Sequence, residues 1–186
     1  MDCRNIRIFS FYIPRDQSPE SQKSQVWNRM EQMIRLAEKR NLCLLHENEK
    51  DIYGDNAARC RELADQFAGP HFACTFDFAN FVQCGQDTLE AYELLAKNIA
   101  YVHVKDALAA DGSVTVAGKG DGHVSEILRR LDADGFQGFL SLEPHLADFA
   151  GFSGLEQGTS QKESGDGAQA FELAYRALEE VLTGSL

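Results

Sequence analysis

Hydrophobic positions follow two different spacings along most of the chain. Short apolar runs predict buried strands, and longer stretches with apolar residues at helical spacing predict amphipathic helices. The predicted strands cover residues 6–12, 42–47, 72–77, 101–105 and 139–143. The predicted helices cover residues 25–40, 56–67, 88–97, 124–134 and 168–182, with Asp55 as a candidate cap of the second. The pattern therefore predicts five β/α units in series.

Strands that alternate with helices indicate an α/β fold with a parallel sheet and right-handed crossovers. An open doubly wound sheet and a barrel both satisfy this pattern, but no G-x-G-x-x-G motif follows the first strand. A complete TIM barrel needs eight strands and roughly 250 residues. We therefore expect residues 1–186 to form one domain, a partial TIM-type barrel of about five β/α units. Residues 151–167 lack apolar periodicity and are expected to be a mobile excursion.

A polar residue able to bind a metal lies at the end of four predicted strands. These residues are Glu47, Asp77, His103 and Glu143. Strand alternation places each of them opposite a mostly apolar face, so they should point inward and meet at one rim of the sheet. His46 breaks this alternation, and we expect it beneath a helix or at the rim, hydrogen-bonded, rather than as a ligand.

Three carboxylates and one imidazole suit a divalent ion such as Mn²⁺, Mg²⁺, Co²⁺ or Zn²⁺. The absence of thiolates argues against a closed structural zinc site. Such a set leaves coordination positions for two neighbouring substrate oxygens. The pattern therefore indicates metal-assisted chemistry on a small polar substrate.

An ordered series of motifs resembles the xylose-isomerase-like barrel superfamily of sugar and sugar-phosphate isomerases and epimerases. The motifs are HENEKDIYGD, DFANF, YVHVKDA, GKGDG and GFLSLEPH. The resemblance implies that the fifth to eighth barrel strands supply Glu47, Asp77, His103 and Glu143 to one divalent cation. It also implies that the first three β/α units are absent. Many relatives carry a His where this chain has Asn80, and an Asn can orient a sugar hydroxyl but cannot exchange protons near neutral pH. A helix-cap or turn role for Asn80 is the alternative.

The resemblance implies proton transfer on a hydroxy-ketone. Glu47 and Glu143, on opposite sides of the sugar, would remove a proton and return it through an enediolate. Return to the other face of the same carbon gives an epimer, and return to the neighbouring carbon gives an aldose-ketose isomer; the sequence does not choose. Lys105 either stabilises the enediolate oxygen or a substrate anion, or forms a salt bridge with an acid such as Asp77.

Other polar residues near the strand ends have two interpretations each. His145 shares its face with Glu143, so it either reaches substrate or lies exposed. The GKGDG segment, residues 118–122, either presents N–H groups to a phosphate or is a plain turn. Arg7 and Asp106 are expected to hold the rim or core through ion pairs.

Composition narrows the choice of partner and compartment. The net charge of −11 would repel nucleic-acid backbones and anionic lipid surfaces. No apolar run approaches the ~18 residues of a membrane span, and no secretory signal is recognisable. The five cysteines form no C-x-x-C pair, which fits reduced thiols. We therefore expect a cytoplasmic protein, and the family resemblance implies a small sugar substrate.

Two further functions remain open. An AP-endonuclease-like phosphodiesterase would need a His-rich multi-zinc cluster and a basic DNA path, which five histidines and the acidic charge disfavour. A truncated barrel with weak or no catalysis would act as a binding or assembly module. Its unpaired sheet edges would then favour homo-oligomers.

Overall fold

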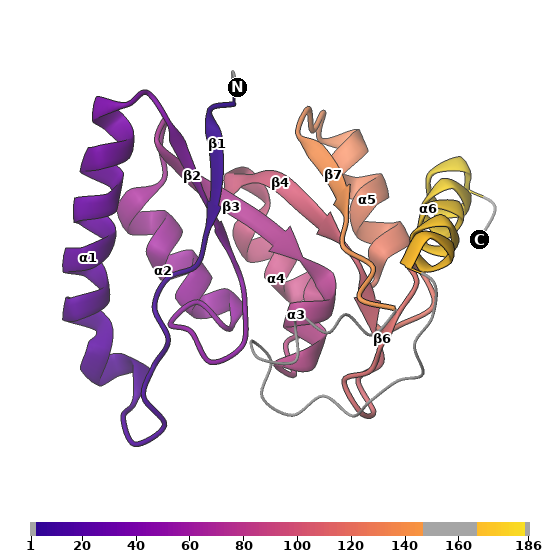
Figure 1. The fold of residues 1–186 in the computed structure, drawn as a ribbon, viewed down its shortest axis with the longest axis horizontal. Coiled ribbons are helices and arrows are strands. Elements are labelled where there is room, and N and C mark those ends of the chain that lie inside the picture. The colour runs from indigo at the N-terminus through magenta and orange to yellow at the C-terminus, as the bar shows by residue number, and fades with distance from the viewer. Residues whose placement is uncertain (1–2, 147–166, 185–186) are drawn as a thin grey trace.

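The computed structural model describes residues 3–146 and 167–184. Its main feature is a parallel sheet with the strand order β1-β2-β3-β4-β7. The strands are β1 (Asn5–Ile8), β2 (Cys43–Glu47), β3 (Phe72–Asp77), β4 (Ile99–Val104) and β7 (Phe139–Leu142). The strands follow one another in chain order, as in a TIM barrel, and the sheet curves into a half-barrel (Figure 1). The prediction of a partial TIM-type barrel is confirmed.

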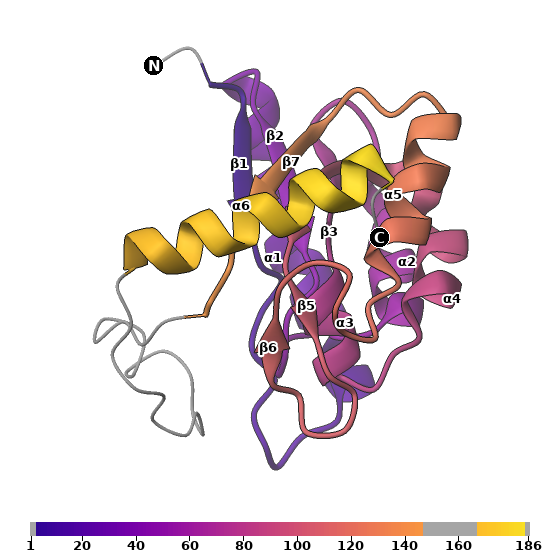
Figure 2. The same cartoon turned by 90° about the vertical axis from the view of Figure 1, so that its right-hand side faces the viewer.

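Helices cover one face of the sheet and leave most of the other face open, while α6 crosses the β7 side of the sheet (Figure 2). The helices are α1 (Pro19–Lys39), α2 (Ala57–Phe67), α3 (Phe78–Gln83), α4 (Thr88–Leu95), the 3₁₀ helix η1 (Ala96–Asn98), α5 (Val124–Ala133) and α6 (Gly167–Thr183). In Figure 1 the strands lie in front of α2, α4 and α5, and in Figure 2 these helices lie to the right of the sheet. The open face is therefore the inner wall of the half-barrel.

Two helix starts differ from the predicted ones. Helix α1 begins at Pro19 rather than at residue 25, because the Ser18 side chain accepts a hydrogen bond from the Ser21 N–H and a proline fits the first helical position. Helix α2 is capped by Asn56 rather than Asp55. Asp55 instead forms an ion pair with Arg59 on the same helix.

Strand β1 is shorter than predicted, and helix α3 and a two-stranded ribbon were not predicted. Strand β1 ends at Ile8, and Tyr12 makes only an isolated bridge to Ile52. Helix α3 follows β3 without a loop. The Gly-rich loop contains an antiparallel ribbon of β5 (Asp106–Ala107) and β6 (Val114–Thr115). Residues 151–166 of the expected mobile excursion lie outside the described residues.

The apolar core lies between the sheet and its helices. One cluster joins β3, β4, α3 and α5 and includes Phe76, Phe78, Phe81, Val102 and Ile127. The ring centroids of Phe76 and Phe81 are 5.1 Å apart. The second cluster joins α1, α2 and the first strands and includes Met30, Leu44, Tyr53, Leu63 and Phe72. Because alternate strand residues are buried under the helices, the residues between them face the open inner wall.

The two outer strands expose apolar side chains. Ile6 on β1 is 43% exposed and Phe139 on β7 is 68% exposed, although the Phe139 ring lies 5.8 Å from that of Tyr101. No helix in the described ranges is both long enough and apolar enough to cross a lipid bilayer. Exposed apolar side chains also lie on the helices, among them Phe171 and Tyr175 on α6 and Leu36 on α1.

Candidate metal centre

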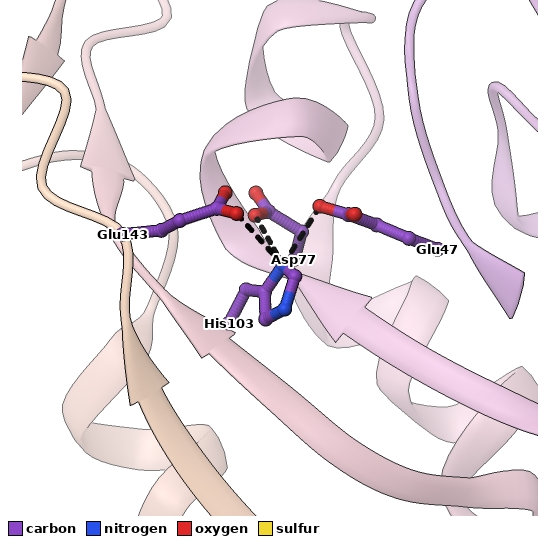
Figure 3. A group of neighbouring side chains, drawn as sticks. All are labelled: Glu47, Asp77, His103 and Glu143. Carbon is purple, nitrogen blue, oxygen red and sulfur yellow. Dashed lines mark hydrogen bonds and ion pairs between the residues drawn. The ribbon is translucent and has the colours of Figure 1, made fainter. Parts of the chain in front are cut away.

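The four strand-end residues meet at one point on the inner wall. Each of them offers one ligand atom, and these atoms all lie within 4.8 Å of one another. Figure 3 shows the three carboxylates pointing at the imidazole of His103. Glu47, Asp77 and His103 are buried, whereas the Glu143 side chain is 28% exposed. Solvent therefore reaches the cluster on the Glu143 side.

The sheet register brings these residues together. Asp77 on β3 lies beside His103 on β4, and His103 lies beside Ser141 on β7, two residues before Glu143. The His103 Nδ1 atom is 2.9 Å from Glu47 Oε1, 3.6 Å from Glu143 Oε1 and 3.9 Å from Asp77 Oδ2. One ring nitrogen thus faces an oxygen of every carboxylate.

Two buried carboxylate oxygens in the cluster lack a hydrogen bond: Asp77 Oδ2 and Glu47 Oε2. Both have a cation nearby, since Lys105 Nζ lies 3.0 Å from Asp77 Oδ2 and Arg7 Nε lies 3.3 Å from Glu47 Oε2. Buried charged oxygens are normally hydrogen-bonded or bound to a metal. This donor set of oxygens and one imidazole nitrogen fits a divalent cation.

Lys105 continues the inward face of β4 beyond His103. Its Nζ atom contacts Glu143 Oε2 at 2.8 Å as well as Asp77. The predicted salt bridge with Asp77 is therefore present. The other predicted interaction, with a substrate oxygen, stays a prediction.

The charges of the cluster shift one another's ionisation. Burial raises the pKa of Asp77, and the positive charge of Lys105 opposes this effect. Burial lowers the pKa of His103, but the hydrogen bond and charge of Glu47 outweigh burial and raise it overall. Burial likewise opposes the charge of Lys105, yet Asp77 and Glu143 raise its pKa. Burial raises the pKa of Glu143, but Lys105 outweighs burial and lowers it. Lys105 is thus a fixed positive charge within a group of acids.

Asn48 joins the ends of β2 and β3 and was not identified from the sequence. Its side chain donates to the Asp77 carbonyl and accepts from the Asp77 N–H, both at 2.9 Å. The sequence signal that could have identified Asn48 was its place directly after the predicted strand that ends in Glu47. This pair of hydrogen bonds fixes the backbone that carries Asp77.

Asn80 is turned toward the loop after β2. Its side-chain amide nitrogen lies 2.9 Å from the Asn48 carbonyl oxygen, 3.3 Å from Glu49 Oε2 and 3.4 Å from Glu47 Oε1. Its backbone N–H donates to Asp77 Oδ1 at 2.8 Å, which caps α3. Asn80 thus supports two metal-ligand candidates, and its role toward substrate stays a prediction.

The GKGDG segment does not hold its N–H groups free for a phosphate. The N–H groups of Gly118, Gly120 and Gly122 donate to the Asp106 carboxylate at 3.1, 3.0 and 2.8 Å. Asp106 also accepts from the Ala107 N–H at 2.9 Å. The prediction of an ion pair for Asp106 is therefore wrong, because its carboxylate accepts hydrogen bonds from backbone N–H groups of the loop instead. The expected ion pair of Arg7 is present, with Glu47.

The two remaining histidines of interest lie on opposite sides of the sheet. His145 Nε2 is 3.9 Å from Glu143 Oε2, so His145 lies at the rim of the centre. His46 faces the helices, where its ring lies 6.2 Å from that of Phe72. The His46 ring is not part of the ligand group, as predicted, but its Nε2 atom has no hydrogen-bond partner, contrary to the prediction.

Known structures share this architecture. A D-tagatose 3-epimerase-like protein matches with a TM-score of 0.70 and 18% identity, covering 100% of this chain and 66% of that one. The 3-keto-D-glucoside 4-epimerase YcjR from E. coli matches with a TM-score of 0.60 and 17% identity over 96% of this chain and 63% of that one. The IolI protein, solved with a bound zinc atom, matches with a TM-score of 0.65 and 13% identity over 98% of this chain and 64% of that one. The chain spans less than two thirds of the length of each.

The sequence itself matches a family model along nearly its whole length. No curated protein matches the chain. The family model is that of the xylose isomerase-like TIM barrel, and it matches residues 1–178. The chain, with its half-barrel and its strand-end cluster, belongs to the xylose isomerase-like TIM barrel family.

Proposed function

We propose that this protein is a metal-dependent isomerase or epimerase of a sugar or sugar phosphate. The observation that carries the proposal is the convergence of Glu47, Asp77, His103 and Glu143 within 4.8 Å. A divalent cation at this point would polarise the carbonyl of a hydroxy-ketone and acidify its neighbouring C–H bond. The chemistry of the donor set, three carboxylates and one imidazole with their ligand atoms turned toward one point, supports the same proposal.

Glu47 and Glu143 are the residues that move the proton. They approach the cluster from opposite sides, with Asp77 and His103 between them (Figure 3). A substrate lying across the cluster would present one face to each glutamate, so one removes the proton and the other returns it through an enediolate. Glu143 is the more accessible of the two, which suits exchange of its proton with solvent.

The names of similar structures favour epimerisation. Two of them are named as epimerases or epimerase-like, and a third holds zinc. Return of the proton to the opposite face of the same carbon is the chemistry of epimerisation. Asn80, beside Glu47, and His145, beside Glu143, would orient substrate hydroxyls at the two ends of the site.

The proposal is tested by metal content and turnover in the same preparations. We expect the wild-type protein to bind about one divalent ion per chain and to convert a member of a ketose panel in the presence of Mn²⁺. Glu143→Gln should weaken binding of the ion by at least about ten-fold and abolish turnover, because it removes one charged ligand. Glu126→Gln, on the outer helix α5, is the matched control and should change neither. Unchanged metal binding in Glu143→Gln would refute this ligand assignment.

The two edges of the sheet support a second candidate, a binding or assembly module. Ile6 and Phe139 are exposed on the outermost strands, whose outer edges lack a neighbouring strand in the described sheet. Such edges favour association with another polypeptide. Size-exclusion chromatography with light scattering, together with the ketose panel, separates the two candidates. A well-folded oligomer without turnover would favour the module.

A further inference from the structure

Lys105 occupies an unusual position for a lysine. Its side chain is 3% exposed, and its Nζ atom lies 2.8 Å from Glu143 Oε2 and 3.0 Å from Asp77 Oδ2. A buried ammonium with two carboxylate partners keeps its charge and has little freedom to leave. The cation is therefore a permanent part of the cluster.

Lysine and a metal ion would need the same carboxylates. Asp77 Oδ1 is already the cap of α3, which leaves Oδ2 as the one oxygen of Asp77 that faces both Lys105 and His103. Glu143 divides its oxygens, with Oε2 on Lys105 and Oε1 3.6 Å from His103 Nδ1. An ion among the four ligand atoms would thus share Asp77 Oδ2 with the ammonium and take the free oxygen of Glu143.

The formal charges also indicate that Lys105 and a divalent ion share these carboxylates. Three ionised carboxylates with Lys105 carry a charge of −2 when the imidazole is neutral, and one divalent ion brings that sum to zero. Arg7 also contacts Glu47, but its side chain is 45% exposed, so water screens its charge. Removing the charge of Lys105 would leave a filled site with a net negative charge and an empty one with three uncompensated carboxylates.

We propose that Lys105 is a built-in cation that shares Asp77 and Glu143 with the bound divalent ion and thereby limits how tightly the protein holds it. This inference rests on the metal binding in the proposed function but not on the identity of the sugar. With the lysine in place, the carboxylates donate less charge to the ion, which leaves the ion better able to polarise a substrate carbonyl. Looser binding and stronger polarisation are thus two effects of one ammonium.

The test is the sign of the change in metal affinity. Titration calorimetry with Mn²⁺ should show that Lys105→Met binds the ion at least about ten-fold more tightly than wild type, because a unit charge close to the ion is removed from a site of low dielectric. The kcat for the ketose should fall in the same variant. Lys23→Met removes a distant lysine that pairs with Glu62 and is the matched control, with unchanged affinity.

A merely structural role for Lys105 predicts the opposite sign. If the lysine only oriented Asp77 and Glu143, its loss would leave the affinity for Mn²⁺ unchanged or weaken it, and either result overturns the inference. Lys105→Gln provides a polar, uncharged replacement in case the Met variant does not fold, and the same tightening is expected. Lys105→Arg keeps the charge and should bind Mn²⁺ with nearly wild-type affinity; tightening as large as in the uncharged variants would also overturn the inference.

Failure of this inference can be told from failure of the proposed function. Tighter Mn²⁺ binding in Lys105→Met, in a protein that turns over no ketose, supports the role of the lysine and contradicts the isomerase or epimerase. Ketose turnover with equal Mn²⁺ affinity in wild type and Lys105→Met does the reverse. Absence of Mn²⁺ binding in all variants contradicts both.

Discussion

A single buried carboxylate shapes the loop beside the candidate metal centre. The Asp106 carboxylate accepts hydrogen bonds from the backbone N–H groups of Ala107 and of three glycines in the GKGDG segment. Because Lys105 directly precedes Asp106, this arrangement also fixes the backbone from which the lysine reaches Asp77 and Glu143. The sequence predicted an ion pair here, since nothing in the pattern of residues shows that loop N–H groups will surround one acid.

We expect Gly120→Ala to destabilise the protein. A methyl group at this position would lie 2.4 Å from the Ala107 carbonyl oxygen and 2.5 Å from Asp106 Oδ1, both of which are fixed. The cost should be about 2 to 4 kcal/mol in the free energy of unfolding, measured with urea. Gly69→Ala is the control, because nothing lies within 4 Å of its added methyl group. Equal stability of the two variants would show that the loop can move away from Asp106.

His46 should make the protein sensitive to acid. Burial lowers the pKa of His46 from 6.5 to about 4, so between these values the unfolded chain binds a proton that the folded chain does not. Stability should therefore fall as the pH falls from about 6.5 to about 4, by roughly 2 to 3 kcal/mol from this residue. The measurement is the free energy of unfolding of wild type minus that of His46→Gln across this range. A difference independent of pH would contradict the prediction.

At the scale of elements, the junction of β3 and α3 links the fold to the centre. Asp77 is the last residue of β3 and the N-cap of α3. Its Oδ1 atom caps the helix, and its Oδ2 atom faces His103 and Lys105 in the ligand cluster. The strand was predicted with its correct bounds because its apolar run is clear. Helix α3 was missed because it is short and continues the apolar run of the strand, so no change of spacing marks its start.

Asp77→Asn and Asp77→Ala should separate these two tasks. Both variants remove the carboxylate charge near His103, so both should lose binding of the proposed divalent ion. Only the Asn side chain keeps an oxygen for the Asn80 N–H, so the Ala variant should be less stable by about 1 kcal/mol or more. Thermal or urea unfolding of the metal-free variants measures this difference. Identical stabilities would show that the cap contributes little to α3.

For the whole molecule, the sequence predicted the architecture and the meeting of the four ligand candidates. Alternation along single strands was enough for this, since each candidate lies on the inward face of its own strand or, for Glu143, directly after it. The contact of Lys105 with Glu143 and the contacts of Asn48 and Asp106 were beyond such an argument, because they depend on the register between strands and on the path of loops. The sequence offered two partners for Lys105, and only the arrangement in space placed it between Asp77 and Glu143.

The four ligand candidates come from β2, β3, β4 and the residue after β7, which are consecutive in the sheet. The candidate ligands thus lie on one uninterrupted arc of neighbouring strands, and the geometry that would hold an ion is set by three successive strand pairings, β2 with β3, β3 with β4 and β4 with β7. A shift of register in any one of these pairings would move at least one ligand candidate away from the others.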